Sequence, residues 1–398
     1  MFDRRLIQNF DWVLLLLLLV VAGISILNLY SATYPIRDVG GSKILTKQIS
    51  WFLIGFLVFF LMTTFNYSSL ERLAYPAYLF SIALLILVLC VGKVTSGSQR
   101  WLSLGAISFQ PSELAKIAMV IIFAKFFSEK GGYREYRLRD LWQPLILMVI
   151  PFVLIVKEPD LGTALFFVAV SVSMVLVVKV YWKSLVILIC SCLSAVPFFW
   201  LSLKEYQQMR ILTLLRPDMD PLGSGYHIHQ SKIAIGSGLF WGKGFLKGTQ
   251  TRLHFLPEQH TDFAFSVLAE EWGLIGSTVL LLIYLLMVLW GLNIAKSSKD
   301  RFGSIMAFGI VALVFWQVVI NVGMVTGLLP VVGIPLPLFS YGGIRASHEY
   351  QYEALYVSVG TYLATRDPGS FMTLWMSSSR VRLIHIAFSC EETEGCAI

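Results

Sequence analysis

Three acidic residues stand at the start of long hydrophobic runs in this sequence. Glu113 lies in FQPSELAKIA, Asp160 in KEPDLGTAL and Asp262 in PEQHTDFAF. A charged side chain beside so much apolar sequence is costly, so each acid is a candidate functional residue. If the three lie together, their carboxylates predict acid–base chemistry.

Asp262 is the strongest candidate for a general base, because a carboxylate there could take a proton from a hydroxyl nucleophile. It follows His260 and Thr261, and His260 is the alternative base. The competing interpretation is structural, since Asp is a preferred N-cap and Asp262 could simply cap the helix that follows.

The other two acids also have a simpler interpretation. Pro111 and Pro159 suit the beginning of a helix, which would make Glu113 and Asp160 ordinary first-turn acids facing the positive helix end. Lys116 stands one turn after Glu113 and fits an i,i+3 ion pair.

Several basic residues could bind phosphate. Arg100 in GSQRWLSLG suits bidentate binding, and Lys232 suits binding as a point charge. Lys243 and Lys247 could do the same, although ordinary loop solubility explains them better. The sequence therefore predicts a site that combines carboxylates with cations able to hold a phosphorylated substrate.

Several other chemistries find no support. The glycines of GSGLFWGKG lack the Lys-Ser/Thr pair of a phosphate-binding P-loop, and neither HExxH nor GxSxG occurs. The five cysteines have neither metal-ligand nor disulfide-framework spacing. We identify no set of metal ligands.

The elements that must position these residues are membrane helices. The 398 residues are 57% hydrophobic and 14% charged, and the mean hydropathy is +0.73. Soluble domains average about 25% charged residues, so a soluble enzyme is excluded. The fold class we expect is an all-α polytopic membrane protein. Nine apolar runs are long enough to span a bilayer: 12–32, 48–65, 74–92, 111–127, 143–157, 161–178, 184–203, 263–295 and 303–329.

Lys and Arg predict the orientation. They concentrate on the connections that share a side with the N-terminus, which places that terminus in the cytoplasm by the positive-inside rule. Part of the net charge of +7 is therefore an orientation signal, and we expect no nucleic-acid partner. All three acids then lie at the outer membrane boundary, beside a large outer loop over 204–262.

The apolar pattern stops after Tyr341-Gly342-Gly343, and charged residues interrupt the remainder. We expect two parts: a transmembrane domain over 1–343, and an atypical tail over 344–398 that is foreign or frame-altered. A short span near 351–365 is the alternative.

The motifs in order resemble the SEDS family of bacterial cell-wall proteins, and its rod-shape members more than its division members. The resemblance covers about residues 1–343. It rests on GSQRWLSLG, FQPSELAKIA, EPDLGTAL, PLGSGYHIHQSKIAIGSG, KGTQTRLHFLPEQHTDFAFSVLAEEWGLIG and GMVTGLLPVVGIPLPLFSYGG. The family has ten spanning helices, one more than this sequence shows.

The resemblance implies a peptidoglycan glycosyltransferase of the bacterial inner membrane, which polymerises lipid II into glycan strands during cell elongation. Asp262 would match the essential aspartate of the family, and Glu113, Lys116 and Asp160 its polar cavity cluster, with Arg100 near the pyrophosphate. The implied partners are a class B penicillin-binding protein and other elongation-machinery membrane proteins. A divalent cation, Mg²⁺ or Mn²⁺, could assist the leaving group.

Two other functions stay open. A lipid II flippase would need a polar path through the bilayer, whereas the acids cluster at one edge. A scaffold without catalytic activity would leave the position of Asp262 beside Glu113 and Asp160 unexplained.

Overall fold

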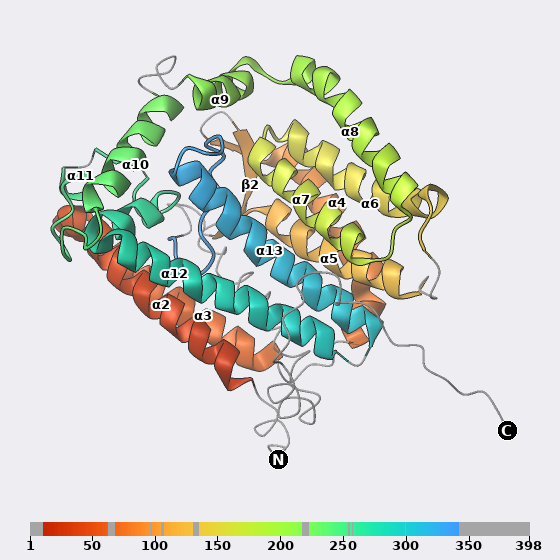
Figure 1. Ribbon diagram of the computed structural model, residues 1–398, viewed down its shortest axis with the longest axis horizontal. Helices are drawn as coiled ribbons and strands as arrows, with labels where there is room; N and C mark the ends of the chain where they lie inside the picture. The colour runs from red at the N-terminus through yellow and green to blue at the C-terminus, as the bar shows by residue number, and fades with distance from the viewer. Residues whose placement is uncertain are drawn as a thin grey trace.

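The computed structural model describes residues 11–62, 68–95, 98–104, 107–129, 135–216, 223–253, 255–256, 258–298 and 300–341. Figure 1 shows long helices packed side by side. The long helices are α2 (Trp12–Thr33), α3 (Gly41–Met62), α4 (Ser68–Val91), α5 (Pro111–Glu129), α6 (Leu138–Lys157), α7 (Leu161–Val177), α8 (Trp182–Ser202), α12 (Ala264–Ser297) and α13 (Arg301–Val325).

Each predicted apolar run falls on one of these helices. Within the described residues, six are long and apolar enough to cross a membrane: α2, α3, α4, α6, α12 and α13. Helix α7 is apolar but shorter, and α5 carries charged residues along its length. The chain is thus a polytopic membrane protein. The assignment of nine spans stays a prediction.

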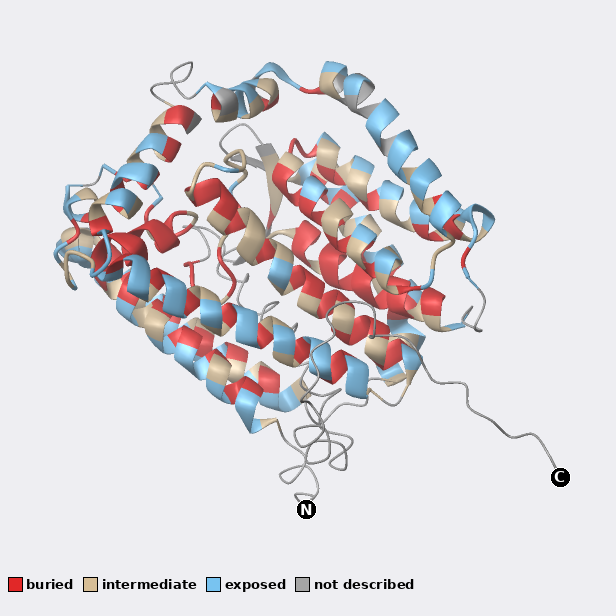
Figure 2. Ribbon diagram, viewed as in Figure 1, coloured by how far each residue is buried: buried red, intermediate tan, exposed pale blue. Residues whose placement is uncertain are grey.

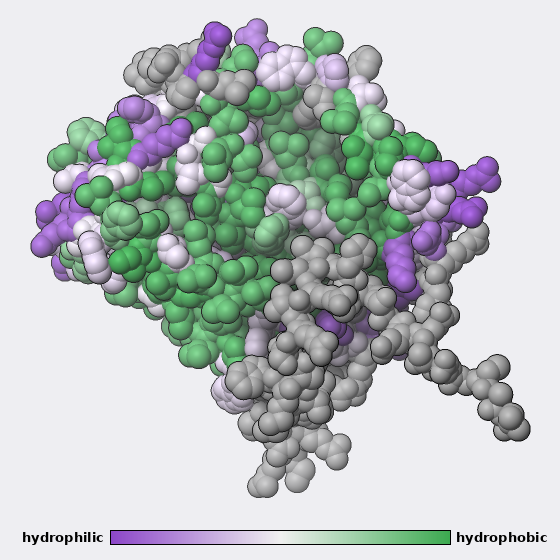
Figure 3. Space-filling view, in the orientation of Figure 1, coloured by the Kyte–Doolittle hydropathy of each residue, from purple (hydrophilic) through white to green (hydrophobic). Residues whose placement is uncertain are grey.

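The outside of the bundle is apolar, as a lipid-facing surface requires. Large side chains such as Leu53, Leu57 and Leu79 point outward from α3 and α4. Figure 3 shows hydrophobic residues over the middle of one face and hydrophilic ones at its margins.

Helix α5 is the central helix of the bundle. Its residues are buried on every side from Pro111 to Ile122, apart from the half-buried Leu114. It packs against α4, α7 and α13, and Figure 2 shows burial concentrated there. A helix enclosed all round has no lipid-facing stripe, which explains how it tolerates Glu113 and Lys116.

The outer loop over 204–262 contains three helices that hydropathy did not predict: α9 (Glu205–Leu215), α10 (Ser224–Gly238) and α11 (Thr249–Arg252). Helix α10 packs against α12. Figure 1 shows this segment arching over one end of the bundle.

The bundle is all-α as expected, and one small sheet accompanies it. Strands β1 (Lys93–Thr95), β2 (Ser98–Leu104) and β3 (Ile107–Phe109) form a small antiparallel sheet between α4 and α5. Alternating residues in SQRWLSL allow a strand, but the segment is too short to be read from hydropathy. This sheet carries Arg100 and Trp101.

After α13 the chain returns toward the centre of the bundle as an irregular segment over 326–341. Asn321 donates hydrogen bonds to the carbonyl oxygens of Asp262 (3.0 Å) and Ile334 (2.8 Å). Ser25 of α2 donates to the Phe339 carbonyl oxygen (2.7 Å). These bonds satisfy non-helical backbone inside the protein, as a membrane setting demands. The tail over 344–398 lies outside the described residues.

Candidate active site

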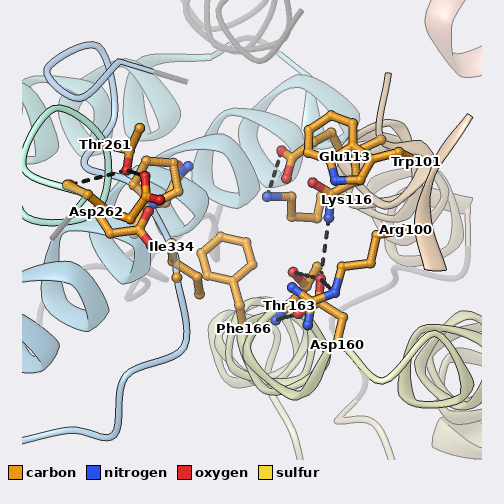
Figure 4. Close-up of a pocket in the computed structure, with 15 residues that line it drawn as sticks. Arg100, Trp101, Glu113, Lys116, Asp160, Thr163, Phe166, Thr261, Asp262 and Ile334 are labelled. Atoms are coloured by element: carbon orange, nitrogen blue, oxygen red, sulfur yellow. Dashed lines mark hydrogen bonds and ion pairs between the residues drawn. The ribbon is translucent and has the colours of Figure 1, made fainter. Parts of the chain in front are cut away.

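A cavity of about 210 Å³ opens where β2, α5, α7 and the return segment meet the residues before α12. Figure 4 shows two groups facing each other across it, with Thr261, Asp262 and Ile334 opposite Arg100, Glu113, Lys116 and Asp160. The cavity is lined by Arg100, Trp101, Gln110, Glu113, Lys116, Asp160, Thr163, Phe166, Glu258, Thr261, Asp262, Gln317, Gly333, Ile334 and Pro335.

The structure therefore brings Glu113, Asp160 and Asp262 to one cavity, together with Arg100 and Lys116. These residues come from separate elements, so only the tertiary fold unites them.

Asp160 has both of the roles that the sequence left open. It is the N-cap of α7, where Oδ1 accepts from the Thr163 amide (3.1 Å) and Oδ2 from the Thr163 hydroxyl (2.9 Å). The same Oδ2 lies 3.4 Å from Nε of Arg100. Arg100 also donates from Nη2 to the Pro159 carbonyl oxygen (2.9 Å). Asp160 thus holds the guanidinium at the cavity wall.

Glu113 and Lys116 form a buried ion pair, with 2.7 Å between Oε2 and Nζ. Lys116 also lies over the ring of Phe166, with Nζ 4.8 Å from the ring centroid. A pair withdrawn from water this far interacts strongly, and removal of one partner leaves an uncompensated charge.

Asp262 is not a helix cap. The N-cap position of α12 is Phe263, without a side-chain capping bond, so the simpler interpretation from sequence was wrong. The Asp262 carboxylate faces Gly333, where an added Cβ would lie 3.2 Å from Oδ2. Gly333 also has φ +71°, so the return segment uses a glycine where it passes the carboxylate.

The surroundings of Asp262 raise its pKa above that of an ordinary aspartate. Burial and the negative charge of Glu258 raise the pKa of Asp262 to about 7, against smaller lowering effects of Arg210 and Arg100. A carboxylate with a pKa near 7 is suited to accept a proton at neutral pH.

Two predicted site residues lie elsewhere. Lys232 is exposed on α10, and its side chain lies against Gly327. It is not among the residues that line the cavity. His260 is absent from the lining, and its ring lies 6.0 Å from that of Tyr341. Burial lowers the pKa of His260, so the ring is neutral near pH 7.

Glu258 is a site residue that sequence reasoning missed. It lines the cavity four residues before Asp262, and its Oε2 accepts from the Thr261 hydroxyl (3.3 Å). Its place in PEQHTD beside the candidate base was the available signal.

A second missed acid, Glu158, lies beside the cavity at the end of α6. Burial and then the charge of Asp160 raise the pKa of Glu158 to about 9. This shift favours the neutral form of Glu158, which adds no second negative charge beside Arg100, already paired with Asp160.

Comparison with known proteins identifies the class that this fold and cavity define. The family model of FtsW, RodA and SpoVE, described as cell cycle protein, matches residues 11–350. Peptidoglycan glycosyltransferase MrdB of Escherichia coli K12 is 40% identical over 336 residues, which cover 84% of this chain and 89% of the relative. Stage V sporulation protein E of Bacillus subtilis is 36% identical over 338 residues, covering 84% and 92%.

Solved structures of related proteins are also similar to this chain. One similar chain comes from a structure described as "Structural coordination of polymerization and crosslinking by a peptidoglycan synthase complex". It is 31% identical to this chain, with a TM-score of 0.75, and the match covers 91% of this chain and 99% of that one. The rod shape determining protein RodA of Thermus thermophilus is 28% identical, with a TM-score of 0.64, covering 90% and 98%. This chain belongs to the FtsW, RodA and SpoVE family, which is the SEDS family.

Proposed function

We propose that this protein is a peptidoglycan glycosyltransferase that polymerises lipid II during cell elongation. It would act at the outer face of the bacterial inner membrane, with its N-terminus in the cytoplasm. The observation that carries the proposal is the cavity in which Asp262 faces the cations Arg100 and Lys116. Its relatives MrdB of Escherichia coli and RodA of Treponema pallidum are named peptidoglycan glycosyltransferases.

In the proposed reaction, Asp262 accepts the proton of the acceptor sugar hydroxyl. The hydroxyl oxygen forms a bond to the anomeric carbon of the donor, and the bond from that carbon to the pyrophosphate oxygen breaks. Undecaprenyl pyrophosphate leaves, and the anomeric configuration inverts. Arg100 and Lys116 stabilise the negative charge that develops on the pyrophosphate.

The packing below the cavity favours an enzyme over a flippase. The next turns of α5 and α7 are filled by fully buried apolar side chains, including Ile122, Phe123, Phe167 and Val170. A flippase needs a polar route for the headgroup across the membrane, and these four residues offer it no polar group.

A divalent cation is a further part of the proposal. Within the described ranges, no group of three or more His, Cys, Asp or Glu residues could hold a metal ion. In this proposal Mg²⁺ or Mn²⁺ would assist the departure of the pyrophosphate.

We also propose that the chain acts with a class B penicillin-binding protein and other elongation-machinery membrane proteins. One structural relative belongs to a peptidoglycan synthase complex. In this proposal residues 1–343 form the transmembrane domain, with the loop over 204–262 as part of it, and 344–398 form a separate tail.

The test is polymerisation of lipid II by the purified protein with its partner. Asp262→Asn keeps the shape of the side chain but removes the base, so we expect glycan yield to fall by about 10²–10⁴-fold. Asp38→Asn, at an exposed aspartate after α2, is the matched control and should keep full activity. Full polymer yield from Asp262→Asn would rule out the base role.

A further inference from the structure

Three large apolar side chains stand exposed in a row where α10 ends. Leu239 is 76% exposed, Phe240 66% and Trp241 83%. We refer to Leu239–Trp241 as the loop tip. Contiguous exposed apolar residues of this size mark a surface that contacts something other than water.

The loop tip is fixed to α12 by backbone hydrogen bonds. The Leu274 amide donates to the Leu239 carbonyl oxygen (2.8 Å), and the Ile275 amide donates to that of Phe240 (3.3 Å). These bonds form where α12 is interrupted at Gly273, whose φ is +64°. The loop tip therefore has a defined position along α12.

That position is the level at which α12 becomes lipid-facing. Every residue from Ala264 to Glu271 is buried in the protein. Beyond the interruption, Leu274, Ile275, Val279 and Leu282 point outward from a helix that is apolar enough to span a membrane. The exposed side chains of the loop tip thus continue the lipid-facing surface of α12.

We propose that Leu239, Phe240 and Trp241 insert into the bilayer leaflet on the same side of the membrane as the cavity. Trp and other aromatic residues are enriched at this depth, where the ring meets both hydrocarbon and headgroups. This inference does not depend on the proposed catalytic activity.

The experiment uses the full chain with its five cysteines replaced by serine, reconstituted in vesicles of phosphatidylethanolamine and phosphatidylglycerol. Trp241→Cys is labelled with an environment-sensitive fluorophore. Lys247→Cys is the matched exposed control on the same loop, and Leu282→Cys is the lipid-facing control on α12. Quenching is measured with a lipid that carries a spin label near its headgroup, and with aqueous iodide.

We expect the label at position 241 to be quenched several-fold more by the spin-labelled lipid than the label at 247, and several-fold less by iodide. Iodide quenching equal to that at 247 would overturn the proposal. Protection from both quenchers would also overturn it, because it would show that protein, either a partner or a second copy, covers the loop tip.

Discussion

Asp160 and Asp262 are both aspartates at the beginning of a helix, yet their surroundings give them different roles. Asp160 receives two hydrogen bonds from Thr163 and lies beside Arg100. Asp262 caps nothing, and burial with the nearby charge of Glu258 raises its pKa to about 7. The first residue is suited to hold a cation in place, and the second to accept a proton.

At this scale we predict the effect of Glu258 on the pH profile. In the proposed reaction the unprotonated form of Asp262 is the active one, so the polymerisation rate should rise as pH passes through about 7. Glu258→Gln removes a charge that raises the pKa of Asp262, so the rising limb should move to lower pH. Arg210→Gln removes a charge that lowers this pKa, and its limb should move to higher pH.

The measurement is the initial rate of glycan formation across pH for each variant, normalised to its own maximum. Comparison of the two variants separates electrostatics from a general loss of activity, because only electrostatics moves them in opposite directions. Shifts in the same direction would contradict this account.

At the scale of elements, the interruption in α12 depends on one glycine. Gly273 has φ +64° and ψ −158°, a conformation that is essentially restricted to glycine. A Cβ there would lie 2.4 Å from the Gly242 amide nitrogen and 2.7 Å from the Phe240 carbonyl oxygen. The Phe240 carbonyl oxygen accepts from the Ile275 amide, and the Gly242 amide donates to the Gly238 carbonyl oxygen (2.8 Å), so moving either atom would disturb a hydrogen bond of this turn.

Gly273→Ala should therefore lower the melting temperature, with a strain of about 1–3 kcal/mol. Gly236→Ala is the matched control, because Gly236 lies within α10 and an added Cβ meets nothing within 4 Å. That variant should be neutral or slightly stabilised. Thermal unfolding in detergent measures both, and equal melting temperatures would show that the interruption carries no strain.

The elements differ in how far sequence predicts them. Long apolar runs determine the positions of the membrane helices, because the cost of exposing backbone polar groups to lipid leaves few alternatives. Helices α9 to α11 and the small sheet are short and mixed in polarity, so hydropathy carries little information about them. The motifs containing Arg100, Glu113, Asp160 and Asp262 predicted a shared site. The exclusion of Lys232 and His260 from its lining depends on long-range packing that no local pattern contains.

At the scale of the whole molecule, the proposed orientation makes the cavity accessible from one side of the membrane. Helix α6 has Arg139 near one end and is followed at the other by Glu158, beside the cavity. Its 20 residues span about 30 Å, which is long enough to place the two ends on opposite sides of a bilayer.

We predict that Glu258→Cys, in the cysteine-free background, reacts with a membrane-impermeant thiol reagent added outside intact spheroplasts. Arg139→Cys, exposed at the start of α6, should react only after the membrane is permeabilised. Mass shifts of the purified protein report both reactions. The reverse pattern would invert the orientation, and reaction of both residues from outside would contradict a cavity open to one side.

No single helix or strand carries both halves of the cavity. Arg100, Glu113, Lys116 and Asp160 belong to β2, α5 and the start of α7, whereas Glu258 and Asp262 belong to the segment that leads into α12. The distance between the proposed proton acceptor and the proposed pyrophosphate-binding cations is therefore set by α13, which packs against α5, α7 and α12. A partner that shifts α12 or α13 would change turnover without touching any reacting group. Substitutions where α13 packs against α5, α7 and α12 would do the same.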